Sequence, residues 1–206
     1  MSIDKKKIIL VEGKDDLNFT IRLLKYKNIN DIMVEQYNGK DNLIHHINSL
    51  INRDGFDEIT SLIIFRDSDD SSQSAIESIN YCLKKTGLIT ENIKPFTINN
   101  YNNRKIGFGL FPGLDDNKNL YNTGSLEHLC LLLLKDNSNH EFVKSYLEDF
   151  QTKNAKFKKP QKNELHSVFS FTDKYVGQLI GQAAEYGGFD FNSPYLNPFI
   201  ELINEM

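Results

Sequence analysis

The sequence lacks both a long apolar run and an excess of positive charge. Its longest apolar stretch, residues 129–134, is much shorter than the roughly 18 residues that a membrane span needs. The opening residues 1–7 are followed by a short apolar run that ends at Glu12, a pattern that predicts no signal peptide. We therefore expect a cytoplasmic protein that makes no membrane contact.

The charge balance is slightly acidic. Lys and Arg total 24 against 28 Asp and Glu, which gives a net charge of −4 at pH 7. This balance argues against a protein that coats nucleic acid or an anionic membrane through bulk charge. A local basic patch remains compatible with it.

Cysteine is scarce as well. Cys82 and Cys130 lie in apolar, helix-like stretches with no second Cys or His at ligand spacing, so we predict two buried, reduced thiols. The five His do not cluster, since the adjacent His45 and His46 would point to different sectors of a helix. We expect no zinc site.

What the sequence does contain is an alternation of strand and helix signals over its first 112 residues. Short apolar runs predict strands, and apolar residues at helical spacing predict the helices between them. We predict an α/β core over 1–115, with a mostly parallel sheet covered by helices on both faces, and a mainly helical extension over 116–206 packed on or beside it. The expected strands cover 8–11, 32–34, 59–65, 96–98 and 106–111, and the later helices 124–135, 141–150, 173–186 and 198–205.

Two of these predicted strands end in acidic residues. One apolar run leads into Glu12, and another leads into Asp67 and Asp69. Sites in parallel sheets lie beyond the carboxyl ends of the strands, so these carboxylates would converge if the two strands are neighbours. Converging carboxylates repel each other unless a cation lies between them, and oxygen ligands favour Mg²⁺ or Mn²⁺. Lys14 is placed to meet a phosphate as a point charge.

Each acid also has a purely structural interpretation. Glu12 can be a surface acid or a partner of a helix dipole, and the stretch 67–71 has the composition of a capping turn. Asp70 can replace or supplement Asp69. Asp15 and Asp16 can cap the following helix or act as outer-shell ligands.

The stretch Leu-Val-Glu-Gly-Lys-Asp-Asp at 10–16, followed by Asp67-Ser68-Asp69, resembles the Toprim domain. That domain is shared by topoisomerases, bacterial primases, OLD-family nucleases and ribosomal-RNA maturases. The resemblance covers about 5–112 and looks especially like the maturase version and small stand-alone Toprim proteins. It implies that Glu12 is a general base or acid or a metal ligand, and that Asp67 and Asp69 hold Mg²⁺.

The resemblance also implies a further acid. Nucleases of this kind often hold a second metal with a Glu after a Ser- or Gly-containing turn, and Gly124-Ser125-Leu126-Glu127 looks like that element. Alternatively, Glu127 only satisfies the dipole of its helix. The remaining chain is too small for the further domains of a topoisomerase or primase. It has no phosphate-binding loop, so an ATPase partner of the OLD type would be a separate protein.

A lysine-rich stretch follows in the helical extension. Residues 151–174 carry six Lys and two acids, a local charge of +4 that leaves −8 for the rest of the chain. This stretch is the candidate for gripping a nucleic-acid backbone, with Phe150 and Phe157 available to stack on bases. A solvated linker between helices is the alternative. The expected contacts are Lys153, Lys156, Lys158 and Lys159, together with Lys14 at the first strand end.

The hypothesis that these observations favour is a Mg²⁺- or Mn²⁺-dependent phosphodiesterase acting on DNA or RNA, with Glu12 and Lys14 as catalytic residues and Glu12, Asp67, Asp69 and Glu127 as metal ligands. A second hypothesis is a non-catalytic module that binds nucleic acid or a nucleotide within a defence or repair complex. A third is a phosphoacceptor domain modified at Asp67. The sequence predicts no oligomeric state.

Overall fold

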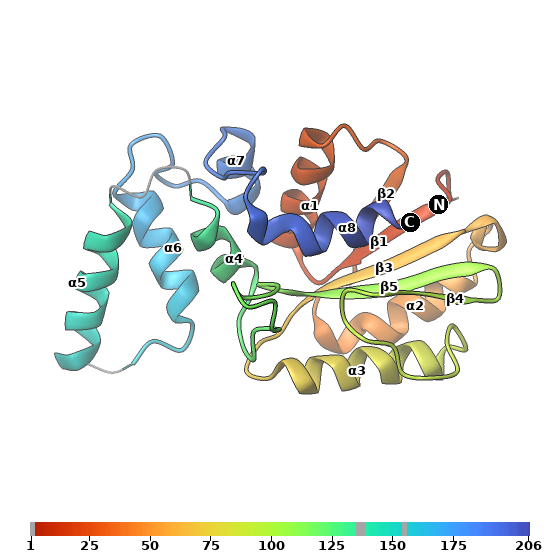
Figure 1. The fold of residues 1–206 in the computed structure, drawn as a ribbon. Coiled ribbons are helices and arrows are strands. Elements are labelled where there is room, and N and C mark those ends of the chain that lie inside the picture. The colour runs from red at the N-terminus through yellow and green to blue at the C-terminus, as the bar shows by residue number, and fades with distance from the viewer. Residues whose placement is uncertain (1–2, 135–138, 154–155) are drawn as a thin grey trace.

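The structure is a computed structural model that describes residues 3–134, 139–153 and 156–206. Its centre is a five-stranded sheet in the order β2-β1-β3-β5-β4 (Figure 1). All neighbouring strands are parallel except β4, which runs antiparallel to β5 and forms one edge. The predicted mostly parallel sheet is therefore confirmed. The strands are β1 (Lys7–Val11), β2 (Ile32–Gln36), β3 (Ser61–Asp67), β4 (Ile98–Tyr101) and β5 (Arg104–Phe111).

Side chains of the central strands are buried on both faces of this sheet. Ile8 and Leu10 of β1 pack toward α2 (Leu43–Ile51) and α3 (Ser72–Lys85). Ile9 and Val11 pack on the opposite face, toward α1 (Lys14–Tyr26) and the C-terminal segments. Burial on both faces explains why these strands read as continuous apolar runs rather than as alternating ones.

In its described residues, the second half of the chain supplies five more helices. The helix α7 packs on α1, and α8 lies along β5, so both belong to the layer that covers one face of the sheet (Figure 1). The helix α6 lies between α5 and α4 at the end of the molecule away from both termini (Figure 1). These helices are α4 (Leu126–Leu132), α5 (His140–Lys153), α6 (Pro160–Ser170), α7 (Ile180–Glu185) and α8 (Asn197–Asn204). The described ranges also contain the short 3₁₀ helices η1 (Lys40–Asn42), η2 (Phe56–Glu58) and η3 (Pro194–Leu196).

Three helical expectations differ from the structure. The helix α6 was not predicted, although Leu165, Val168 and Phe169 are buried at helical spacing and Pro160 stands in its first turn, where a missing N–H costs nothing. The helix expected over 173–186 begins only at α7, because the left-handed Gly177 interrupts the chain before it. The helix expected over 124–135 is shorter in the structure, because α4 ends at Leu132 and Leu134 forms a β-bridge with Phe189; Lys135 itself lies outside the described residues.

Cys82 and Cys130 are both buried and carry free thiols. Among the helices of the described residues, none is long and apolar enough to cross a bilayer.

Candidate functional site

The pairing of β1 with β3 brings the two predicted acidic strand ends together. Val11 lies opposite Phe65 in this parallel pair, so the chain leaves both strands at the same edge of the sheet. Glu12 follows the first strand, and Asp67 is the last residue of the second. The sheet topology therefore accounts for the proximity of these two carboxylates.

A loop from the second half of the chain is fastened to this edge. The backbones of Asp69 and Gly124 exchange two hydrogen bonds of 2.9 Å, and the Leu126 N–H donates to Oδ1 of Asp67 at 2.9 Å. Gly124 has a φ of +136°, and a Cβ there would lie 2.7 Å from Cδ of Pro112, so a glycine is required. This fastening brings the start of α4 against Asp67.

Glu127 consequently lies at the same edge. Its Oε2 accepts a 2.7 Å hydrogen bond from Oγ of Ser125, and its Oε1 is 3.4 Å from Nζ of Lys162. Burial raises the pKa of the Glu127 carboxyl, but the bond from Ser125 and the charge of Lys162 outweigh burial and lower it overall. Glu127 is therefore an ionised carboxylate with one cationic neighbour.

Asp16 is a member of this group whose role the sequence left open. It lies on the buried face of α1 with Phe19 and Leu23, and its Oδ2 accepts the Gly13 N–H at 3.0 Å, so it does cap the helix. Phe19 and Leu23 follow Asp16 at i+3 and i+7, and this helical spacing is the sequence signal that puts Asp16 on the buried face of α1. Asp15, one position earlier, is only partly buried.

Burial raises the pKa of three of these carboxyls, and neighbouring carboxylates add to each shift. Burial, followed by the charges of Asp16, Glu127 and Glu12, holds the pKa of Asp67 well above its usual range. Burial and the charge of Glu12 raise the pKa of Asp16 to about 7. Burial also raises the pKa of Glu12, while Arg66 opposes the shift. Four acids thus share a region in which their negative charge is incompletely balanced. We call Glu12, Asp16, Asp67 and Glu127 the carboxylate cluster.

Two oxygens of this cluster are buried without a protein donor. Within the described ranges, Oε2 of Glu12 and Oδ1 of Asp16 have no hydrogen-bond partner. Buried acceptors of this kind are costly unless a cation or water satisfies them, so the donor set fits a hard divalent metal. Across the part of the chain that the structure describes, no group of three or more His, Cys, Asp or Glu side chains is arranged so that it could hold a metal ion.

A buried arginine, for which the sequence predicts no role, also contacts the cluster. Nε of Arg66 is 3.8 Å from Oε2 of Glu12, while its Nη1 donates to Oγ of Ser78 in α3 at 2.9 Å. The hydroxyl of Tyr37 is buried close by, and burial followed by the charge of Glu12 holds its pKa well above the usual range. Both side chains therefore lie within electrostatic reach of Glu12.

Asp69 lies at the rim rather than in the cluster. Its side chain is 42% exposed, and its Oδ2 is 3.3 Å from Nζ of Lys40. It lines one hollow with Glu12 and a second hollow with Asp67. The structure therefore brings Asp69 close to the predicted ligands but pairs it with an exposed lysine.

The predicted lysines divide into two groups. Lys14 lines the hollow that contains Glu12 and Asp16, and Lys159 lines all three adjoining hollows around the cluster. The hollow beside Asp67 has a volume of about 430 Å³, and its opposite wall carries Lys158, Lys159 and Lys162. Lys153 instead pairs with Asp149 at 2.6 Å on α5, and in the described residues neither Lys153 nor Lys156 lines these hollows.

Comparison with known protein families matches residues 6–206 to the family described as "Protein of unknown function (DUF3226)". The chain belongs to this family. No curated protein matches the chain.

Solved structures reveal a similar fold. The C-terminal region of the Xanthomonas campestris pv. campestris OLD protein, in its mercury-phased crystal, aligns over 98% of this chain and 96% of its own with a TM-score of 0.50 and 13% identity. The platinum-phased crystal of the same region aligns over 98% of this chain and 93% of its own, with a TM-score of 0.47 and 14% identity. At this identity the first likeness establishes a shared α/β fold.

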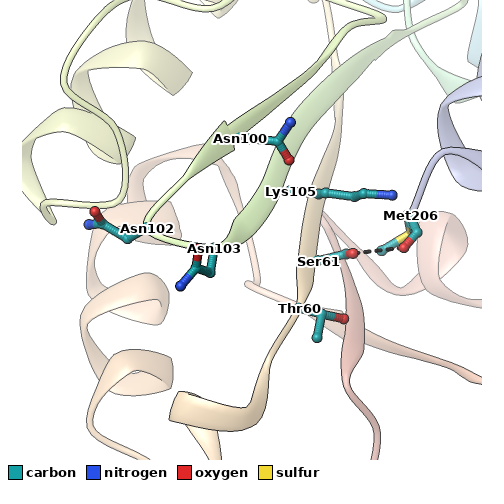
Figure 2. Close-up of a pocket in the computed structure, with 7 residues that line it drawn as sticks. All are labelled: Thr60, Ser61, Asn100, Asn102, Asn103, Lys105 and Met206. Atoms are coloured by element: carbon teal, nitrogen blue, oxygen red, sulfur yellow. Dashed lines mark hydrogen bonds between the residues drawn. The ribbon is translucent and has the colours of Figure 1, made fainter.

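A further hollow lies at the opposite end of the sheet (Figure 2). It measures about 640 Å³ and contains no carboxylate side chain among its described lining residues. Oγ of Ser61 donates to the carbonyl of Met206 at 2.9 Å, shown dashed in Figure 2, and Nζ of Lys105 donates to the carbonyl of Glu205 at 2.7 Å. The polar groups here fasten the chain that follows α8, which gives this hollow a structural role.

Proposed function

We propose that the protein is a Mg²⁺- or Mn²⁺-dependent nuclease that hydrolyses phosphodiester bonds in DNA or RNA with a Toprim-type site. The observation that carries the proposal is the carboxylate cluster at the carboxyl edge of two parallel strands. It combines raised pKa values for Glu12, Asp16 and Asp67 with buried oxygens that lack protein donors in the described residues. A divalent cation would relieve both conditions.

Glu12, Asp16, Asp67 and Glu127 would hold the metal, with Asp69 available at the rim. When bound, such a metal supplies polarisation of a phosphate oxygen and lowers the pKa of a bound water. Glu127 contributes full negative charge, since its pKa is lowered. This assignment extends the set expected from sequence by Asp16 and moves Asp69 to its outer side.

The remaining steps fall to side chains of the chain itself. Lys159 faces every hollow around the cluster and would bind a non-bridging phosphate oxygen as a point charge, with Lys14 on the α1 side. As general base, Glu12 would accept a proton from the attacking water with the carboxylate oxygen that does not hold the metal. Arg66 would hold the Glu12 carboxylate in place.

Cleavage of labelled single-stranded and duplex DNA and RNA, measured with Mg²⁺, Mn²⁺ or EDTA, tests the proposal. We expect metal-dependent cleavage that Glu12→Gln and Asp67→Asn each reduce by at least about a hundredfold, because each removes a cluster carboxylate. Circular dichroism should show that both variants remain folded. The exposed Glu91→Gln is the matched control and should cleave normally.

Cleavage that survives both cluster substitutions would refute the proposal. Metal-independent binding without turnover on any of these substrates would instead favour a non-catalytic nucleic-acid-binding module.

A further inference from the structure

A row of exposed aromatic rings runs along α5. Phe142, Tyr146 and Phe150 follow one another at intervals of four residues, so they share one side of the helix. The first two are 60% and 55% exposed, and Phe150 is 38% exposed. We call these three residues the aromatic row. Large apolar side chains are seldom left in water at regular spacing unless they bind something.

The row is not the main anchor of α5. Val143 is buried and Leu147 packs partly against the main core, so these two residues, which adjoin the row, anchor the helix. The ring of Phe142 meets Phe171 edge-on at 5.8 Å, and Phe150 stacks parallel on Phe157 at 5.6 Å. These contacts orient the end rings while Tyr146 stays open between them.

The row leads directly into the lysine-rich stretch. Phe157 lies between Lys156 and Lys158, and Lys158 and Lys159 line the 430 Å³ hollow that contains Asp67. Between Asp149 and Glu164 the sequence has no acid. Among the residues that the structure describes, Lys156, Lys158 and Lys159 make no ion pair, so their charges are available to an external anion.

We propose that the aromatic row and Lys156, Lys158 and Lys159 form a platform for single-stranded nucleic acid, which delivers a phosphodiester to the carboxylate cluster. This inference rests on the proposed function and names its substrate class. Ring faces followed by unpaired lysines complement unpaired bases on a phosphate backbone. A duplex keeps its base faces inside its own stack, so the row favours a single strand or a single-stranded end.

Fluorescence anisotropy in EDTA measures binding without turnover. The probes are fluorescein-labelled oligothymidine, oligouridine of the same length, and the oligothymidine paired to its complement. We expect tighter binding of the single strands than of the duplex. Tyr146→Ala and Phe142→Ala should each raise the single-strand dissociation constant at least about fivefold, whereas Tyr146→Phe should retain binding.

The matched control is Tyr81→Ala, because Tyr81 is 59% exposed on α3, away from the row. It should bind as the unmodified protein does. Lys156→Ala should weaken both single strands alike and reduce the slope of log affinity against log salt by about 0.7.

Parallel cleavage assays separate this inference from the proposed function. The platform is wrong if the protein cleaves with metal but its row variants bind single strands normally. It is also wrong if the cleaving protein binds the duplex more tightly than the single strands. In both cases the proposed nuclease function stands. If the row variants lose single-strand binding and the unmodified protein shows no cleavage, the platform is supported and the nuclease function is refuted. Light scattering tests whether the row instead joins two copies of the chain. If the row variants are monomers where the unmodified protein is a dimer, and their oligonucleotide affinity is unchanged, the row is a dimer contact and the platform is wrong.

Discussion

Polar side chains at the two ends of the β-sheet differ in how far their hydrogen bonds are satisfied. At the amino end, Ser61 and Lys105 donate to backbone carbonyls near Met206, and Arg104 donates to the carbonyl of Ile59. At the carboxyl end, Glu12 and Asp16 each keep a buried oxygen without a donor in the described parts of the chain.

The difference contrasts polar groups that stabilise the fold with polar groups that belong to the proposed site. Satisfied polar groups at the amino end stabilise the fold, since each hydrogen bond replaces one made to water. Unsatisfied carboxylates with raised pKa values destabilise it, and proteins retain such groups where a ligand completes them. The size of a hollow is a poor guide here, because the larger one lies at the satisfied end.

The largest expected contrast between the two ends is their response to metal. Mn²⁺ at about a hundred times its dissociation constant should add about 2.7 kcal/mol of stability, which corresponds to a rise in Tm of about 5–10 °C. Asp67→Asn should abolish this rise, whereas Ser61→Ala should keep it. Differential scanning fluorimetry with and without EDTA measures both, and an equal response in the two variants would erase the contrast.

A smaller effect is expected from Asp16→Asn in the absence of metal. The pKa of Asp16 is about 7 in the folded protein against 3.8 ordinarily, so the folded state binds more protons between these values and stability rises as pH falls through this window. Asparagine removes the penalty of the buried charge and can still cap α1. At pH 8 the variant should gain roughly 1–2 kcal/mol, or about 2–8 °C in Tm, and little at pH 4.

Asp15→Asn is the control for that measurement, since Asp15 neighbours Asp16 on α1 but lies outside the buried face. A pH-independent gain in Asp16→Asn would show that burial of charge is not the cause.

The smallest expected effect lies at the amino end. Ser61→Ala removes the donor to the Met206 carbonyl in a fully buried position, so we expect a loss of about 1 kcal/mol and a fall in Tm of about 2–4 °C. Nuclease activity at the optimum should not change. Urea unfolding at neutral pH checks the loss, and a fall in cleavage would mean that this end also serves the site.

The sequence was most informative where the end of a strand fixes both the fold and the position of an acid. The apolar runs ending at Glu12 and Asp67 predicted parallel strands, and their pairing in register brings the two acids to one edge. The motif 124–127 predicted a further acid there, and the fastening of Gly124 to Asp69 brings Glu127 beside Asp67. In each of these cases the local sequence already contained the relevant signal.

Sequence reasoning was weaker where a neighbouring element decides a residue's role. Asp16 has an ordinary capping position, and only the packing of α1 on the sheet turns it toward Glu12 and Asp67. Arg66 lies in an apolar strand with no local sign of its contact with Glu12. The lysine stretch has the composition of a solvated linker, yet α6 brings Lys159 and Lys162 over the cluster.

The sequence by itself determined the sheet, its two acidic strand ends and a local excess of lysine, because burial periodicity and charge are written along the chain. The tertiary structure decided which acids share a site and which lysines face them. Those relations join residues far apart in sequence, such as Asp67 with Leu126 and Glu127 with Lys162. They depend on how helices pack against the sheet edge, and local propensity carries no information about that packing.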